Sequence, residues 1–156
     1  MRIQLGSGRH YWPGFTNIDG GGRCDEVCDV KKLNYHDNSV DEIYAIHLFE
    51  HLSRLEVQDI LSEWRRVLKP QGKLVLEMPC LDKMAQMIVD GETNIRLTLL
   101  GIFGDPREAS RMMLHQWSYT KKEITDLFLN CGFSCEVTEP VYHLPKRDMR
   151  ITGIKL

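Results

Sequence analysis

The sequence predicts an α/β fold, a mostly parallel sheet with helices between its strands. Short apolar runs alternate with helical patterns along the chain. The 156 residues are the length of one domain, without repeats, low-complexity tracts or linkers rich in Pro, Gly or Ser. With 42% hydrophobic and 27% charged residues, the composition is that of an ordinary globular protein. We therefore expect a single domain over residues 1–156.

Four short apolar runs in the first third of the chain predict strands, at residues 3–5, 15–18, 26–30 and 41–46. Only nine residues, 6–14, separate the first two strands, and they include Pro13 and Gly14. A crossover between parallel strands normally takes a dozen or more residues. The first crossover is therefore abbreviated, or these two strands are not parallel neighbours.

A helix is expected over residues 54–68, because apolar side chains recur there on one helical face. Ser53 and Glu56 have the spacing of a capping box at its start, and Lys-Pro-Gln-Gly at 69–72 ends it. A fifth strand follows at 73–78.

The second half of the chain contains its least regular part, residues 81–119. Thr120 and Glu123 form a second capping box, which opens a helix that Gly132 closes. The other elements expected here are helices at 81–89 and 94–103, a break at 104–106, and strands at 133–137 and 150–154.

The charge balance excludes some partners. Twenty basic residues against 22 acidic ones give a net charge of −2, so no cationic surface is expected for a nucleic-acid backbone. There is no apolar signal segment at the start, and the longest apolar stretch, 97–103, is too short to span a bilayer. We expect a cytoplasmic protein with no membrane span and no nucleic-acid partner.

The five cysteines, at 24, 28, 80, 131 and 135, cannot all pair within the chain. Two pairs have a three-residue gap, which invites a zinc interpretation, but zinc knuckles commonly use a two-residue gap on a tight turn. We interpret the cysteines as reduced, partly buried thiols and expect no metal.

The segment Leu5-Gly6-Ser7-Gly8 directly follows the first strand. Two glycines let the backbone turn tightly and let a ligand approach it, at the carboxyl edge where open α/β sheets bind ligands. Asp19 ends the second strand and can accept hydrogen bonds from both hydroxyls of a ribose. Asp29 ends the third strand and can accept from an adenine amino group. Taken singly, either aspartate can instead be a turn cap.

Two other nucleotide-binding classes fit the glycine segment poorly. Tyr11 stands where the dinucleotide fingerprint has its third glycine, which disfavours a nicotinamide-dependent oxidoreductase. No Lys-Ser or Lys-Thr pair follows the glycines, so the segment is not a nucleoside-triphosphate loop.

Over nearly its whole length the chain resembles class I S-adenosylmethionine-dependent methyltransferases, in a small type 11-like subgroup. The matching stretches are residues 5–8, 13–19, 37–44, 47–52 and 63–72. The resemblance implies a Rossmann-like, doubly wound sheet of about seven strands, mostly parallel with an antiparallel last strand. It also implies an abbreviated first crossover.

The resemblance implies S-adenosylmethionine as cofactor and S-adenosylhomocysteine as product. The residues it places at the cofactor are Leu5, Gly6, Ser7, Gly8, Asp19, Asp29, Val30, His47 and Leu48. Two positions depart from the family pattern: no acidic residue precedes the glycine segment, and His10 replaces the third glycine of the fuller loop. These departures keep open the alternative of a non-catalytic binding or scaffold domain with the same fold.

Methyl transfer requires the acceptor atom to be held in line with the methyl group, and an oxygen or nitrogen acceptor can need a base. His47 follows the fourth strand, where the resemblance places the methyl-donor end, and is a candidate base or pocket wall. His115 is a second candidate base, and Trp117 and Tyr119 are candidate substrate walls. The alternatives are a hydrogen-bonded turn residue for His47 and a core aromatic cluster for the others.

The expected reaction is methyl transfer to a small-molecule or glycan-type acceptor, at oxygen. Methylation of DNA bases is disfavoured, because residues 47–50 read His-Leu-Phe-Glu and not Asn-Pro-Pro-Tyr. Residues 81–119 and 140–149 are expected to shape the acceptor side, and His143 in the second segment is interpreted as part of a solvated loop. The short chain predicts an open pocket, or one completed by a second subunit in a homo-oligomer.

Overall fold

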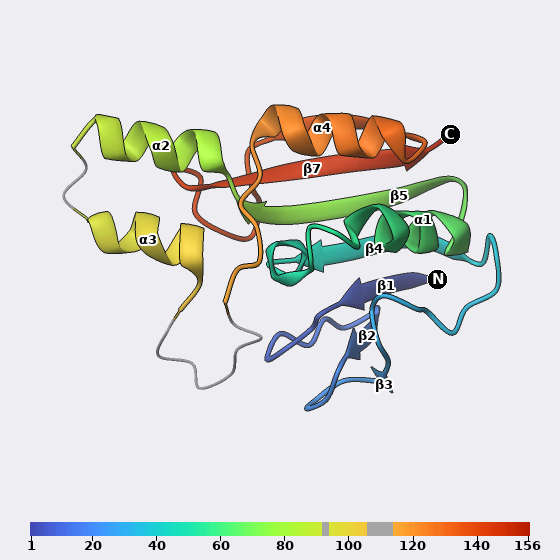
Figure 1. Cartoon of the computed structure of the whole chain (residues 1–156). Helices are drawn as coiled ribbons and strands as arrows, with labels where there is room; N and C mark the ends of the chain where they lie inside the picture. The colour runs from blue at the N-terminus through green and yellow to red at the C-terminus, as the bar shows by residue number, and fades with distance from the viewer. Residues whose placement is uncertain (92–93, 106–113) are drawn as a thin grey trace.

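The computed structural model describes residues 1–91, 94–105 and 114–156 (Figure 1). Within these residues seven strands form one sheet, in the order β3-β2-β1-β4-β5-β7-β6. The strands are β1 (Arg2–Leu5), β2 (Thr16–Asp19), β3 (Glu26–Val27), β4 (Val40–Ile46), β5 (Leu68–Pro79), β6 (Phe133–Thr138) and β7 (Asp148–Lys155). The strand β7 runs antiparallel to both β5 and β6, and the other neighbours are parallel. The predicted fold class is confirmed.

The first crossover is as short as predicted. β1 and β2 are parallel neighbours, with Ile3 opposite Thr16. The amide side chain of Asn17 shapes the loop, since its oxygen accepts from the Trp12 N–H at 2.8 Å and its nitrogen donates to the Trp12 carbonyl at 3.1 Å. The Trp12 ring lies 5.8 Å from that of Tyr44 on β4, so an aromatic side chain packs against the sheet from this short connection.

The helices are η1, a 3₁₀ helix (Phe49–His51), α1 (Val57–Val67), α2 (Leu81–Val89), α3 (Ile95–Phe103) and α4 (Lys121–Asn130). One predicted capping box is confirmed, because the Thr120 hydroxyl accepts from the Glu123 N–H at 3.1 Å at the start of α4. The other is wrong. The Ser53 hydroxyl accepts from the Leu55 N–H instead, and α1 begins at Val57 without a side-chain cap.

The core lies between the sheet and the two helices α1 and α4, which run along the same face (Figure 1). Trp64 of α1 is fully buried and donates its indole N–H to the Val30 carbonyl at 2.7 Å. Phe128 of α4 is also fully buried, and its ring centroid lies 5.5 Å from that of Phe133. This packing fixes the carboxyl ends of β1, β4 and β5 at one edge, and α2 and α3 lie beyond that edge (Figure 1).

All five cysteines are free, and Cys80 is the buried one, as expected for reduced thiols. Among the described residues, no helix has both the length and the apolar character needed to cross a membrane.

Candidate functional site

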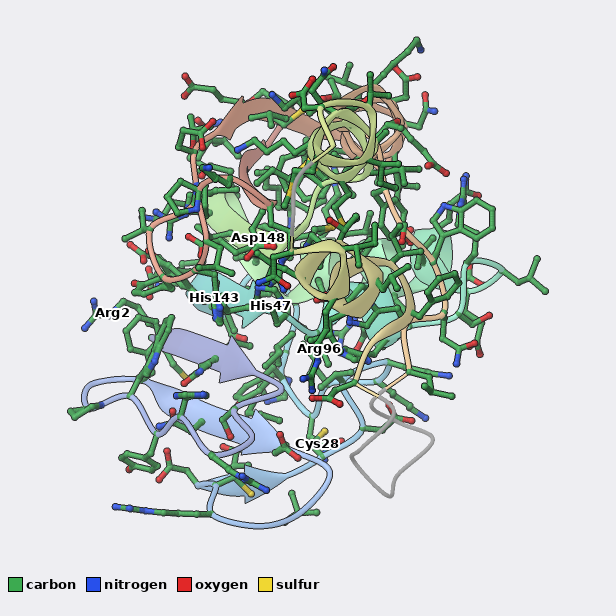
Figure 2. The ribbon with its side chains drawn as sticks, turned by 90° about the vertical axis from the view of Figure 1, so that its left-hand side faces the viewer. Arg2, Cys28, His47, Arg96, His143 and Asp148 are labelled. Carbon is green, nitrogen blue, oxygen red and sulfur yellow. The ribbon has the colours of Figure 1, made fainter. Side chains whose placement is uncertain are left out.

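The candidate site lies at the carboxyl edge of the parallel strands, which Figure 2 views face on. His47, His143 and Asp148 gather near its centre. Arg96 of α3 and Cys28, just after β3, lie on the same edge (Figure 2). The site therefore collects residues from segments that are far apart in the sequence.

The glycine segment after β1 is tightly fitted. Gly6 and Gly8 have φ angles of +65° and +52°, in the left-handed region that side chains disfavour. A β-carbon on Gly6 would lie 2.8 Å from Cδ1 of Leu48, so the backbone can pass Leu48 only without a side chain. The Gly8 N–H donates to Oδ2 of Asp19 at 2.8 Å. Three segments predicted to bind the cofactor thus meet at one place.

The same residues fit a nucleoside cofactor. A β-carbon on Gly8 would meet nothing within 4 Å, so the loop is open on the side next to Asp19. Asp19 is half-buried, and its Oδ1 accepts no hydrogen bond from any described residue, which leaves that oxygen for a ribose hydroxyl. Ser7 is buried and donates its N–H to the Ile18 carbonyl at 3.2 Å, which fixes the loop to β2.

Asp29 lies beyond the end of β3, which is only two residues long. Its Oδ1 accepts from the Lys31 N–H at 2.9 Å, the geometry of a turn cap. Asp29 is exposed and lies beside Val30, whose carbonyl Trp64 fixes. A contact between Asp29 and adenine stays a prediction.

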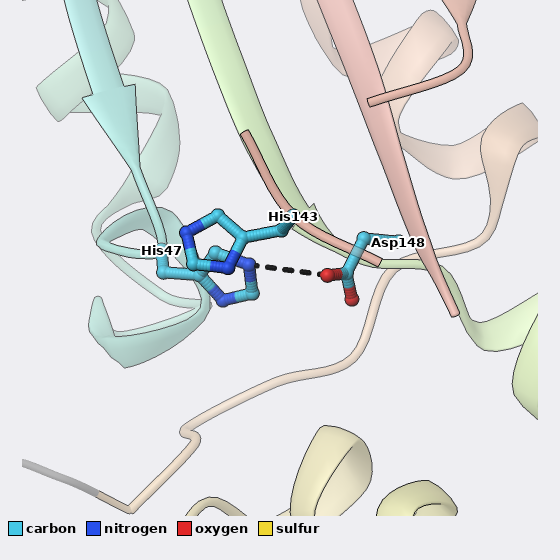
Figure 3. Close-up of side chains that lie close together, drawn as sticks. All are labelled: His47, His143 and Asp148. Atoms are coloured by element: carbon cyan, nitrogen blue, oxygen red, sulfur yellow. Dashed lines mark ion pairs between the residues drawn. The ribbon is translucent and has the colours of Figure 1, made fainter. Parts of the chain in front are cut away.

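His47 directly follows β4, with a positive φ of +51°. Its N–H donates to the Glu77 carbonyl at 2.8 Å, continuing the sheet. Its Nδ1 lies 2.9 Å from Oε1 of Glu50, and its Nε2 lies 3.4 Å from Oδ2 of Asp148 (Figure 3). Burial would lower the pKa of His47, but the charges of Glu50 and Asp148 outweigh it and raise the pKa to about 9. At neutral pH His47 is therefore a cation between two buried carboxylates.

Asp148 begins β7 and is fully buried. Arg147 donates to both of its oxygens, at 2.6 Å and 2.9 Å, and the Leu144 N–H donates to Oδ2 at 3.2 Å. Burial raises the pKa of Asp148, but the contacts with His47 and Arg147 outweigh it and lower the pKa to about 2. The carboxylate therefore ties the last loop to the end of β4.

Because its pKa is lowered on folding, Asp148 should stabilise the protein above its unfolded pKa of 3.8, and this contribution should disappear as the pH falls toward 2. We expect Asp148→Asn to cost about 2 kcal/mol near neutral pH and less in acid. Urea unfolding of both proteins from about pH 7 to about pH 3 measures the gap. A gap that stays constant over this range would contradict the assignment.

His143 is a site residue that the sequence interpretation missed. Its exposed ring lies 4.0 Å from the ring of His47, centroid to centroid. Burial of part of the ring and the charge of His47 lower the pKa of His143, so it is neutral at pH 7. No motif in the local sequence identifies His143 as a site residue. Its loop reaches this edge because the chain there leads into β7, which runs antiparallel to β5.

The segment after residue 113 divides between site and core. His115 is half-buried, and its Nδ1 lies 2.8 Å from the Gly101 carbonyl. Trp117 is 44% exposed, and its indole N–H is shared between the carboxylate oxygens of Glu123 at 3.1 Å and 3.2 Å. Tyr119 is fully buried, with its ring 5.3 Å from that of Phe49. The structure therefore puts Tyr119 in the core and not in a substrate wall, because it packs between the sheet edge and η1.

Comparisons with known proteins agree with this geometry. A family model described as a methyltransferase domain (Methyltransf_11) matches residues 21–76. A search of curated proteins gave no significant match.

Several solved structures share the fold over nearly the whole chain. A SAM-dependent methyltransferase from Methanosarcina mazei is 19% identical with a TM-score of 0.67, and the match covers 99% of this chain and 92% of that one. A possible histamine N-methyltransferase from Thermotoga maritima is 15% identical with a TM-score of 0.67, covering 99% and 82%. The 1,6-didemethyltoxoflavin-N1-methyltransferase of Burkholderia thailandensis was solved with bound 1,6-didemethyltoxoflavin and S-adenosylhomocysteine. It is 13% identical with a TM-score of 0.66, and the match covers 99% of this chain and 70% of that one.

The chain therefore contains a match to a methyltransferase domain over residues 21–76, and it has the fold of S-adenosylmethionine-dependent methyltransferases.

Proposed function

We propose that the protein transfers the methyl group of S-adenosylmethionine to an oxygen atom of a small-molecule or glycan-type acceptor, with His143 as the base. The observation that carries the proposal is the exposed imidazole of His143 beside His47, at the edge where the cofactor residues end. An alcohol must lose its proton as the new bond forms, and a neutral imidazole near pH 7 suits that transfer.

His47 is proposed as a positioning residue. Both of its ring nitrogens lie near buried carboxylates, at 2.9 Å and 3.4 Å, so neither is free to take a proton from an acceptor. It links η1, through Glu50, to the start of β7, through Asp148. This link fixes the loop that carries His143.

Exposed aromatic side chains support the choice of acceptor class. Tyr142, next to His143 in the chain, is 49% exposed, and its ring lies 4.7 Å from that of Trp12. Trp117 offers a second exposed ring surface. Aromatic faces of this kind suit a sugar ring or a planar small molecule. We propose that Tyr142 and Trp117 contribute to the acceptor side, in place of the buried Tyr119.

The test is a panel of acceptors with a labelled methyl donor, comparing sugars and phenols with amines and thiols of similar shape. We expect label on hydroxyl acceptors. His143→Ala should lower kcat at least about 100-fold with little change in donor affinity, because one base is typically worth that much. It should also remove the acidic limb of the pH–rate profile, whereas His36→Ala, which changes an exposed histidine elsewhere, should have no effect.

Label only on amines or thiols would reject oxygen as the acceptor atom. Full kcat in His143→Ala, with the acidic limb intact, would reject His143 as the base while leaving the methyltransferase activity itself in place.

A further inference from the structure

Glu50 is a buried carboxylate whose surroundings do not satisfy it. It is 1% exposed, and neither of its side-chain oxygens has a hydrogen-bond partner among the residues that the structure describes. Its ion pair with His47 involves Oε1 alone. Oε2 has therefore lost its water without gaining a partner among the described residues, which is costly for a buried carboxylate.

The other buried carboxylates at this edge differ from Glu50. Glu77 is fully buried and accepts from the Val141 and Tyr142 N–H groups at 2.7 Å and 3.0 Å, in addition to an ion pair with Arg150 at 3.1 Å. The protein therefore saturates buried acids here as a rule, and Glu50 is the exception. Within the described part of the chain His47 is paired with Oε1 alone, so Oε2 of Glu50 is free to bind a second cation.

Two histidines, His51 and His115, lie close to this carboxylate, and in each of them Nδ1 has a backbone carbonyl as its partner. Nδ1 of His51 lies 3.2 Å from the Leu114 carbonyl, and Nδ1 of His115 lies 2.8 Å from the Gly101 carbonyl. A carbonyl can only accept, so in each ring Nδ1 carries a proton and Nε2 is the nitrogen left for a metal. Histidines that bind metals almost always donate their other N–H to a carbonyl or carboxylate in this way.

We infer that Glu50, His51 and His115 form a binding site for a divalent transition-metal ion. One ligand atom from each residue lies within 4.8 Å of the other two. A metal about 2.1 Å from each ligand needs the ligand atoms about 3.3 Å apart, so binding requires the three side chains to move closer together. Two imidazoles and a carboxylate suit Zn²⁺, Fe²⁺ or Co²⁺ and leave coordination positions open.

The backbone holds the three ligands in place before any metal arrives. Glu50 and His51 are neighbours in η1. The Glu50 carbonyl accepts from the Gln116 N–H at 2.7 Å and from the Trp117 N–H at 3.3 Å, so the segment that carries His115 is hydrogen-bonded to the segment that carries Glu50. Ligands held on a fixed scaffold bind with less loss of entropy.

A second cluster, His47, His143 and Asp148, has comparable spacing. Its carboxylate is already occupied, because Arg147 and the Leu144 N–H donate to the oxygens of Asp148. Because Arg147 donates to both oxygens of Asp148, this carboxylate is less available to coordinate a metal. The two clusters thus make different predictions for which variants lose metal.

The inference concerns binding and stands whether or not the metal takes part in methyl transfer. The test starts from protein that has been treated with a chelator. It is titrated with Co²⁺ and with Zn²⁺, and binding is measured by calorimetry and by the Co²⁺ absorption spectrum. We expect one equivalent to bind, with the visible bands of nitrogen and oxygen ligation and no thiolate charge-transfer band. His51→Ala and His115→Ala should each weaken binding at least about tenfold. Glu50→Gln should do the same, with Glu56→Gln, an exposed glutamate, as its control.

Circular dichroism shows whether each variant folds, and the two histidine variants decide the question even if Glu50→Gln does not fold. His143→Ala and His36→Ala should bind as the wild type does. The inference is overturned by the absence of saturable binding, by a thiolate band, by loss of binding in His143→Ala with retention in His115→Ala, or by equal loss in His36→Ala.

Discussion

Replacement of Gly6 by alanine should destabilise the protein by about 2–4 kcal/mol and abolish tight binding of S-adenosylmethionine. Gly6 has a φ of +65°, and the new β-carbon would lie 2.8 Å from Cδ1 and 3.1 Å from Cβ of Leu48. Because the clash reaches Cβ, Leu48 cannot escape by rotating its side chain alone. The segment after β4 must move, and with it a predicted wall of the cofactor site.

Gly8→Ala is the matched control for this change. Gly8 is also left-handed, with a φ of +52°, but an added β-carbon would meet nothing within 4 Å. It should therefore cost only the backbone strain, about 1–2 kcal/mol. Urea unfolding and calorimetric titration with the cofactor measure both effects. Equal losses of stability in the two variants would show that the contact with Leu48 is unimportant.

Replacement of Asp19 by alanine should weaken S-adenosylmethionine binding by about 10- to 100-fold, the worth of hydrogen bonds to a charged group. The variant removes the oxygen proposed for the ribose and also the acceptor of the Gly8 N–H at 2.8 Å. Asp19→Asn keeps a neutral acceptor and should fall between the wild type and Asp19→Ala.

Asp59→Ala controls for the lost charge, because Asp59 is an exposed carboxylate in the first turn of α1. Calorimetry at one ionic strength compares the four proteins. If Asp19→Ala binds the cofactor as tightly as the wild type does, the ribose assignment is wrong.

The fold was largely predictable because its signals are local. The strands β1 and β4 are apolar runs whose bounds the sequence gives to within one residue, whereas β5 begins at Leu68, five residues before the predicted start at residue 73. The start of α1 was not predictable in the same way. Residues 49–51 form η1, and the chain reaches the helix only at Val57, although Ser53 and Glu56 have the spacing of a cap. The Ser53 hydroxyl accepts from the Leu55 N–H, two residues on, and so does not cap the helix.

The candidate site also contains residues that local sequence signals identify and residues that only long-range contacts bring together. Gly6 and Asp19 were found because each lies at the end of a strand and parallel strands end at a common edge. The environment of His47 could not be found, because Asp148 lies 101 positions away in sequence and reaches it only through the antiparallel return of β7. The same return makes His143 part of the site and could not be inferred from residues 140–149 alone.

The central claim is that the carboxyl edge of this sheet binds S-adenosylmethionine through the loop after β1 and the end of β2. Its most direct test is calorimetric titration of the wild-type protein with S-adenosylmethionine and with S-adenosylhomocysteine. We predict that each binds at one site per chain, and that the two compete for it. The absence of binding of either compound at millimolar concentration would contradict the claim.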